Sequence, residues 1–179
     1  MRVIFTPMVM VRKFSVGLLT FLLVCSLSVI HPSFGAGGRT PVYAKNGMVS
    51  SASMLASEVG ASTLQAGGNA VDAAIATALA LAVTWPSAGN IGGGGFLIYH
   101  GDDGMATTFD FREKAPMAAT ERMYLGLDGS VVNNSNHFGP LAVGVPGTVA
   151  GLYLAHQRLG SMAWSDLVQP AVELALNGI

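Results

Sequence analysis

Arg112 is the side chain whose type and position best suit the binding of a small ligand. It follows the segment Thr108–Phe111, which has the residues of a strand, and precedes Glu113 and Lys114. A guanidinium at a strand end can bind a carboxylate through two parallel hydrogen bonds. Because arginine stays protonated and has no nucleophile, Arg112 is expected to bind substrate while another group reacts. From the residues alone, a salt-bridged strand end is the alternative.

The other reactive side chains form no recognisable catalytic or metal site. Three histidines have no ligand spacing between them and are expected at the surface or at a hairpin end: His100, His137 and His156. The sequence contains neither a G-x-S-x-G nor an H-E-x-x-H motif. Asp110 and Glu113 offer a paired-carboxylate mechanism as an alternative, which is disfavoured because a cation next to a carboxyl group opposes its role as a protonated acid. We therefore assign no catalytic residue, metal ligand or cofactor to this sequence.

A run of four glycines, Gly92–Gly95, precedes the first strand segment. Glycine allows positive φ and the close approach of a ligand or another backbone. Phosphate-binding loops run from a strand through glycines into a helix, whereas this run follows a helix and precedes a strand. No Gly-Lys-Ser/Thr sequence occurs either, so nucleotide binding is disfavoured.

The first 35 residues have the features of a secretory signal peptide. Basic residues precede an uncharged stretch from 14 to 30 that is rich in Leu and Val, and small residues follow at Ser33 and Gly35. Cleavage near Gly35 is expected, which predicts an exported protein, periplasmic or extracellular. Two alternatives are an uncleaved membrane anchor, because the apolar stretch is slightly long, and a poorly fitting lipoprotein site at Cys25.

Charge and cysteine content narrow the range of partners. Beyond Gly35 the sequence has six basic and ten acidic residues, a formal charge of −4, so nucleic acid is not an expected partner. Cys25 is the only cysteine and lies in the apolar stretch. The segment beyond it therefore has no thiol for a disulfide, a nucleophile or a zinc site.

Helix formers and glycine or proline boundaries divide the rest of the chain. Asn69 is a typical N-cap, Asp72 suits the first turn after it, and Gly67-Gly68 ends the preceding helix. The alanine-rich helix after Asn69 is predicted to be a buried scaffold that packs against a sheet. The predicted helices span residues 51–65, 70–83, 118–124 and 164–177, and a further helix follows an N-cap at Thr148 and runs to Leu159. Between them are predicted a hairpin of 96–99 and 105–111, an exposed loop over 127–140 and a strand at 141–145.

Five blocks of sequence, in the same order, resemble the N-terminal part of γ-glutamyltransferases (γ-glutamyltranspeptidases) from about Gly47 to Ile179. Five ordered blocks are more specific than any one of them. In that family the arginine that matches Arg112 holds the α-carboxylate of the γ-glutamyl group, which agrees with the carboxylate clamp inferred above. The blocks are residues 47–51 (GMVSS), 67–74 (GGNAVDAA), 92–96 (GGGGF), 110–116 (DFREKAP) and 144–151 (GVPGTVAG).

The resemblance implies an α+β fold of the N-terminal-nucleophile hydrolase type, a four-layer α-β-β-α sandwich of which this chain is an incomplete N-terminal portion. Such precursors cut themselves into a large and a small subunit. The threonine exposed by the cut attacks the γ-amide of glutathione, and the γ-glutamyl group passes to water, an amino acid or a peptide. This threonine is implied to lie beyond Ile179, so the fragment alone is expected to be inactive. The implied partners are glutathione, other γ-glutamyl compounds and the small subunit.

A Gly-Thr pair at residues 147–148 resembles a processing site, but it lies inside a block that matches the large subunit. We interpret Thr148 as a helix cap instead. Thr148→Ala is then expected to reduce stability and to leave the chemistry unchanged. The predicted organisation is a signal peptide over 1–35, a flexible segment over 36–46 and a partial large-subunit domain over 47–179.

Two alternative functions stay open. One is an amidase of the same architecture, such as a cephalosporin acylase or a transpeptidase that processes poly-γ-glutamate. The other is a non-catalytic exported protein that uses Arg112 to bind an acidic ligand. For the γ-glutamyltransferase interpretation, membrane association is expected only through the signal peptide or a possible anchor.

Overall fold

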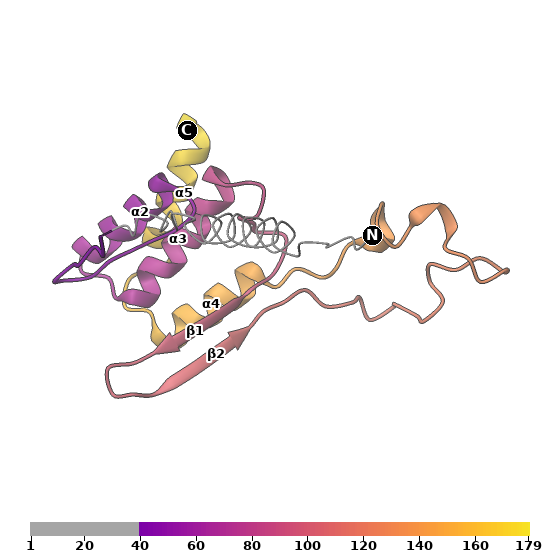
Figure 1. Cartoon of the computed structure of the whole chain (residues 1–179), viewed down its shortest axis with the longest axis horizontal. Helices are drawn as coiled ribbons and strands as arrows, with labels where there is room; N and C mark the ends of the chain where they lie inside the picture. The colour runs from indigo at the N-terminus through magenta and orange to yellow at the C-terminus, as the bar shows by residue number, and fades with distance from the viewer. Residues whose placement is uncertain (1–39) are drawn as a thin grey trace, which may run out of the picture. The chain divides into compact units, whose positions relative to one another are not determined.

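The computed structural model describes residues 40–179, of which residues 44–179 form one compact unit (Figure 1). The predicted signal peptide and residues 36–39 lie outside the described residues. Residues 40–50 contain no helix or strand. In the part of the chain that the structure describes, no helix is long and apolar enough to cross a membrane.

Two helices joined by a glycine pair begin the compact unit. α2 spans Met54–Gln65 and begins later than predicted, because Ser53 is its N-cap and accepts a hydrogen bond from the backbone of the first turn. α3 spans Ala70–Thr84 with the predicted N-cap, Asn69. Asn69 Oδ1 accepts from the Asp72 N–H at 3.0 Å, and the Asp72 carboxylate accepts from the Asn69 N–H at 2.9 Å. This reciprocal capping box fixes the start of α3.

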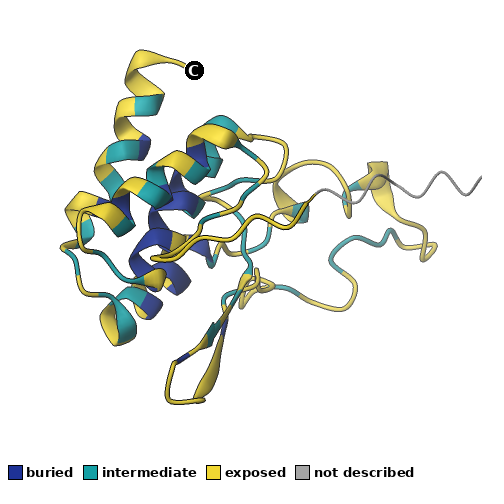
Figure 2. Ribbon diagram, turned by 60° about the vertical axis from the view of Figure 1, so that its left-hand side comes forward, coloured by how far each residue is buried: buried dark blue, intermediate teal, exposed yellow. Residues whose placement is uncertain are grey.

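α3 is the central helix of the unit. Figure 2 shows the buried residues concentrated on it. It packs most extensively against α2 and α5, the latter spanning Trp164–Asn177, and also contacts α4. The prediction of a buried scaffold helix is therefore confirmed, although within residues 40–179 its main partners are helices and not a sheet. Small side chains allow this close approach; the buried apolar residues of α3 are Val71, Ala73, Ile75, Ala76, Leu79 and Ala80.

The predicted β-hairpin is confirmed. β1 spans Phe96–His100 and β2 spans Ala106–Asp110, and the two strands pair antiparallel with Leu97 opposite Phe109. Phe109 is buried and packs in the core with residues of α3, α4 and α5. On the opposite face of β1, Phe96 and Ile98 are 59% and 78% exposed. The hairpin therefore has one face on the core and one face open to solvent, on which Phe96 and Ile98 of β1 lie opposite Asp110 and Thr108 of β2.

The last two helices are confirmed, although α4 begins one residue earlier than predicted. α4 spans Thr148–Leu159 and α5 spans Trp164–Asn177. Their core side chains join α3 and Phe109 in one apolar cluster. Figure 1 shows α4 beside the hairpin, and the beginning of α4 lies near the start of β1 and the end of β2. The buried residues of α4 and α5 in this cluster are Leu152, Ala155, Leu167 and Ala171.

Two predicted elements are wrong. Residues 118–124 form successive turns without a helix, and they are mostly exposed, so tertiary packing does not stabilise a helix there. In place of a strand at 141–145, the chain forms the 3₁₀ turn η2 (Pro140–Ala142) and one isolated bridge between Lys114 and Val145. A longer ladder would require a donor from Pro116, which has no N–H. The predicted loop over 127–140 is confirmed as mostly exposed, with the 3₁₀ turn η1 at Val132–Asn134.

Candidate substrate-binding site

Arg112 lies two residues beyond the end of β2 and is exposed. Its backbone N–H donates a hydrogen bond to Asp110 Oδ1 at 3.0 Å, which closes a local turn after the strand. Asp110 thereby shapes the backbone at Arg112, while the arginine side chain is exposed to solvent. The cation predicted from the sequence is therefore accessible to a ligand.

Three segments that are distant in the sequence meet at the backbone of Arg112. Phe111 N–H donates to Gly95 O at 3.1 Å, Gly147 N–H donates to Gly93 O at 2.8 Å, and Val145 N–H donates to Lys114 O at 2.8 Å. We call this meeting point the glycine junction; it consists of residues 93–95, 111–114 and 144–151. These segments belong to three of the five blocks singled out in the sequence, and the fold brings all three together.

Close contacts, and not positive φ, require glycine at the junction. A Cβ on Gly94 would lie 2.7 Å from Phe111 O and 2.8 Å from Arg112 Cα. A Cβ on Gly147 would clash with Phe111 O, and one on Gly151 would clash with the Phe111 ring. The backbone before and at Arg112 therefore lies against glycines on both sides, with no space for a side chain between them.

Thr148 is not the N-cap that the sequence predicted. α4 begins at Thr148, the N-cap position is occupied by Gly147, and no side chain caps the helix. The Thr148 hydroxyl instead donates to Asn90 Oδ1 at 2.6 Å, and Thr148 is buried. Asn90 Oδ1 also accepts from the Gly93 N–H at 2.9 Å. The prediction failed because a tertiary acceptor 58 positions away competes with the local helix terminus for the hydroxyl.

Asp110 and Glu113 have different neighbours in the structure. Asp110 accepts from the backbone of Arg112, as described above. Glu113 lies along the glycines instead: a Cβ on Gly144 would be 3.0 Å from Glu113 Cβ, and a Cβ on Gly93 would be 3.1 Å from Glu113 Oε1. The two carboxylates have different neighbours, which gives no support to the paired-carboxylate alternative.

The three histidines lie apart from the junction. His100 ends β1 and His137 lies in the loop, and both are exposed. His156 in α4 differs from the surface position expected, because it is half-buried and its Nε2–H donates to Met162 O at 2.8 Å. Its ring also packs at 5.4 Å, between centroids, from Trp164. Among residues 40–179, no three His, Cys, Asp or Glu side chains are grouped so that they could hold a metal ion.

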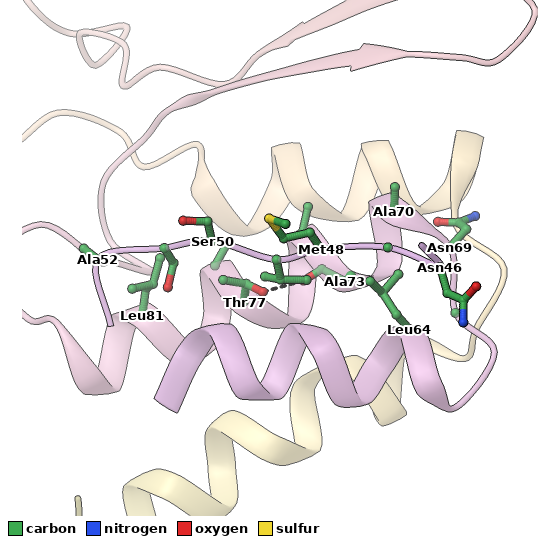
Figure 3. A pocket seen from close by; sticks show the side chains of 16 residues that line it. Asn46, Met48, Ser50, Ala52, Leu64, Asn69, Ala70, Ala73, Thr77 and Leu81 are labelled. Atoms are coloured by element: carbon green, nitrogen blue, oxygen red, sulfur yellow. Dashed lines mark hydrogen bonds between the residues drawn. The ribbon is translucent and has the colours of Figure 1, made fainter. Parts of the chain in front are cut away.

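Two cavities adjoin along α3. The larger, about 730 Å³, lies between the extended segment 46–52 and helices α2 and α3, and no titratable side chain lines it (Figure 3). The smaller, about 410 Å³, is lined by Gly94, Phe111 and Thr148 and so reaches the glycine junction. Both share the α3 residues Ala74, Ala78 and Leu81. We call the two together the α3 trench; it supplies apolar surface, whereas Arg112 supplies the charge.

Sequence reasoning missed Asn90 and the glycine in the middle of α4. Gly151 had a usable signal, because glycine inside a helix costs about 1 kcal/mol and is commonly retained for packing. Asn90 precedes the glycine run, where a turn role is the ordinary interpretation. Its bond to Thr148 has no signal in the sequence, since it depends on how α4 docks.

The family model of gamma-glutamyltranspeptidase matches residues 56–179. The chain belongs to this family. The glutathione hydrolase proenzyme of Pseudomonas sp. (strain A14) is 50% identical over 167 residues, which are 93% of this chain and 28% of that protein. The chain thus spans less than a third of the length of this relative.

Solved structures of the γ-glutamyltranspeptidase family and of related enzymes share the fold. The crystal structure of Helicobacter pylori gamma-glutamyltranspeptidase matches 78% of this chain and 40% of that chain, with a TM-score of 0.75 and 48% identity. Cephalosporin acylase from Bacillus halodurans matches 83% of this chain and 27% of that chain, with a TM-score of 0.68 and 32% identity. These matches confirm the predicted α+β fold of the N-terminal-nucleophile hydrolase type, of which residues 40–179 form a portion with helices and one hairpin.

Proposed function

We propose that this chain is the N-terminal part of a γ-glutamyltransferase and glutathione hydrolase precursor. Membership of the γ-glutamyltranspeptidase family supports this, as does 50% identity to a protein named glutathione hydrolase proenzyme. The reaction is transfer of the γ-glutamyl group of glutathione and γ-glutamyl amides to water, amino acids or peptides. Identity is 48% with the H. pylori γ-glutamyltranspeptidase and 32% with the cephalosporin acylase, which favours this activity over that of a related amidase.

In this proposal Arg112 binds the α-carboxylate of the γ-glutamyl group. The observation that carries it is an exposed guanidinium on a backbone that glycines contact from two sides. Two parallel N–H groups match the two oxygens of a carboxylate, and a fixed backbone reduces the entropy lost when they bind. The chain thereby holds the donor at its α-carbon end and leaves the γ-amide for attack.

The nucleophile is proposed to be a threonine of a downstream segment of the same precursor, which becomes the small subunit after self-cleavage. Its hydroxyl oxygen bonds to the γ-carbonyl carbon, the C–N bond breaks, and the amine leaves with a proton. Water or an acceptor amine then attacks the resulting ester and releases the threonine. Phe96, Ile98 and the α3 trench present apolar surface of the kind that such a segment would cover.

We also propose that the protein is exported after removal of residues 1–35. The basic start, the uncharged apolar stretch from 14 to 30 and the small residues up to Gly35 support this. The proposed activity uses no cofactor, and nucleic acid is not a proposed partner.

Arg112→Lys in the full-length enzyme tests the carboxylate clamp. Lysine keeps the charge and loses the two-pronged contact, which is worth about 1.5–3 kcal/mol for hydrogen bonds between charged groups. The KM for γ-glutamyl-p-nitroanilide is therefore expected to rise about 10- to 100-fold, with a smaller effect on kcat. Arg122→Lys is the matched control, because Arg122 is exposed in the turns over residues 118–124 and is not part of the junction.

Three outcomes separate the candidate functions. Unchanged kinetics in Arg112→Lys would contradict the clamp. A full-length protein that binds acidic ligands without releasing p-nitroaniline would favour the non-catalytic binding protein. Hydrolysis of a cephalosporin side chain in preference to a γ-glutamyl amide would favour the acylase alternative.

A further inference from the structure

We propose that Asn90 and Thr148 are positioning residues that hold the backbone of Arg112 in place for carboxylate binding. This inference rests on the proposed role of Arg112. Neither side chain has an ionisable group, and both bond within the protein, so they act through Arg112 and not on the substrate.

Two hydrogen bonds converge on the side-chain oxygen of Asn90. Asn90 Oδ1 accepts from the Thr148 hydroxyl at 2.6 Å and from the Gly93 N–H at 2.9 Å. A carbonyl oxygen has two lone pairs, so both are used. The amide of Asn90 therefore joins the start of α4 to the glycine run.

Two backbone hydrogen bonds also join the glycine run to the start of α4. Gly93 O accepts from the Gly147 N–H at 2.8 Å and from the Thr148 N–H at 3.1 Å. The C=O of Gly93 is thus bonded directly to the start of α4, and its N–H is bonded to Asn90, which also accepts from the Thr148 hydroxyl. The helix N-terminus thus has one acceptor, Gly93 O, for the N–H groups of Gly147 and Thr148 in place of a side-chain cap.

Gly94 and Gly147 lie directly against the backbone of Arg112. A Cβ on Gly94 would lie 2.8 Å from Arg112 Cα, and a Cβ on Gly147 would lie 3.4 Å from Arg112 O. Gly94 follows the bonded Gly93 directly, and Gly147 precedes Thr148. Because packing here leaves no room, a shift of Gly93 relative to α4 must displace Arg112.

The Thr148 hydroxyl has no ready substitute. Thr148 is 6% exposed, so a water molecule has little access to the position that the hydroxyl occupies. Removing the hydroxyl leaves Asn90 Oδ1 with one hydrogen-bond donor in place of two. The expected consequence is a looser glycine junction and a guanidinium that is less often in the geometry that binds a carboxylate.

Thr148→Val and Thr148→Ser in the full-length enzyme test the positioning role. Valine keeps the shape and removes the hydroxyl, whereas serine keeps the hydroxyl. We expect Thr148→Val to raise the KM for γ-glutamyl-p-nitroanilide about tenfold and to change kcat by less than about twofold. Thr148→Ser is expected to keep the wild-type KM. Thr63→Val is the matched control, because Thr63 is also a buried threonine and its hydroxyl donates within α2 at 2.9 Å.

The same substitution in the Arg112→Lys background separates positioning from general loss of stability. If Thr148 acts through Arg112, Thr148→Val should raise KM little further once Arg112→Lys has removed the two-pronged contact. Full additivity of the two effects would overturn the proposal, as would a fall in kcat and thermal stability with KM unchanged. Should Thr148→Val give no soluble enzyme, Asn90→Ala removes the acceptor and is expected to give the same rise in KM; an unchanged KM would overturn the proposal.

Failure of this inference is distinguishable from failure of the proposed function. If Arg112→Lys raises KM and Thr148→Val does not, the clamp stands and the positioning role is wrong. If Arg112→Lys leaves KM unchanged, the clamp itself is wrong, whatever Thr148→Val does.

Discussion

The carboxylate of Asp72 accepts hydrogen bonds from both the backbone N–H and the hydroxyl of Ser161, 89 positions further along the chain. The Ser161 N–H lies 3.1 Å from each carboxylate oxygen, and the hydroxyl oxygen lies 2.5 Å from Asp72 Oδ2. Next to it, Asn69 Nδ2 donates to Leu159 O at 2.7 Å. The capping box at the start of α3 thus also holds the connection between α4 and α5.

Asp72→Asn should destabilise the full-length protein by about 2–3 kcal/mol, because the amide cannot accept all the N–H and O–H donors that converge on the buried carboxylate. The midpoint of urea denaturation measures this. Asp102→Asn, at an exposed aspartate of the hairpin turn, is the control and is expected to leave the midpoint unchanged. Equal midpoints for Asp72→Asn and wild type would show that the bonds to Ser161 contribute nothing.

The same residue predicts a pH dependence. Burial raises the pKa of Asp72, but the hydrogen bonds from Ser161, Asn69 and Met162 lower it more, so the pKa in the folded protein lies below the usual 3.8. A lowered folded pKa means that the stabilisation is fully present above about pH 4 and is lost as the pH falls through the folded value. The stability gap between wild type and Asp72→Asn should therefore narrow below pH 3.8. A gap that stays constant during acidification would be incompatible with this assignment.

Gly94→Ala should impair both stability and donor binding. Its Cβ would meet backbone atoms of residues 111–113, which cannot move aside as a flexible side chain would. We expect a loss of about 1–3 kcal/mol and a higher KM for γ-glutamyl donors. Gly92→Ala is an unusually close control, since the same substitution two positions earlier points into open space. Similar behaviour of the two variants would refute the close packing of the glycine run.

The Gly147–Thr148 peptide bond is expected to stay intact in the mature enzyme. Thr148 is buried, its N–H donates to Gly93 O and its hydroxyl donates to Asn90 Oδ1, so both groups have structural partners within the fold. Edman sequencing of the mature subunits checks this directly. Detection of an N-terminus at Thr148 would reverse the assignment.

Export predicts a new N-terminus near Ala36. Expression of the full-length precursor in a bacterium, followed by fractionation and N-terminal sequencing, should find the large subunit in the periplasm or medium beginning close to that residue. A large subunit that begins at Met1 and sediments with membranes would instead establish the uncleaved anchor.

Local chemistry determined much of the fold. Asn69 is the predicted N-cap with Asp72 in the predicted first turn, the segments around the Gly101–Gly104 turn form the predicted hairpin, and α5 has the predicted bounds. α4 ends where predicted and begins one residue earlier. These features depend on residues a few positions apart, whose preferences act before any tertiary contact. The two elements predicted wrongly, at 118–124 and 141–145, had weak local signals and received no packing or partner strand.

The candidate site likewise has features that the sequence determined and features that depend on tertiary packing. The sequence by itself determined that Arg112 follows a strand, that glycines precede that hairpin, and that the five blocks resemble one family. Only the tertiary structure decided that the glycines and the start of α4 enclose the backbone of Arg112, and that the Thr148 hydroxyl bonds Asn90 and does not cap its own helix. The physical reason is that a hydrogen-bond donor takes the best acceptor within reach, and packing of segments 58 residues apart determines which acceptor that is.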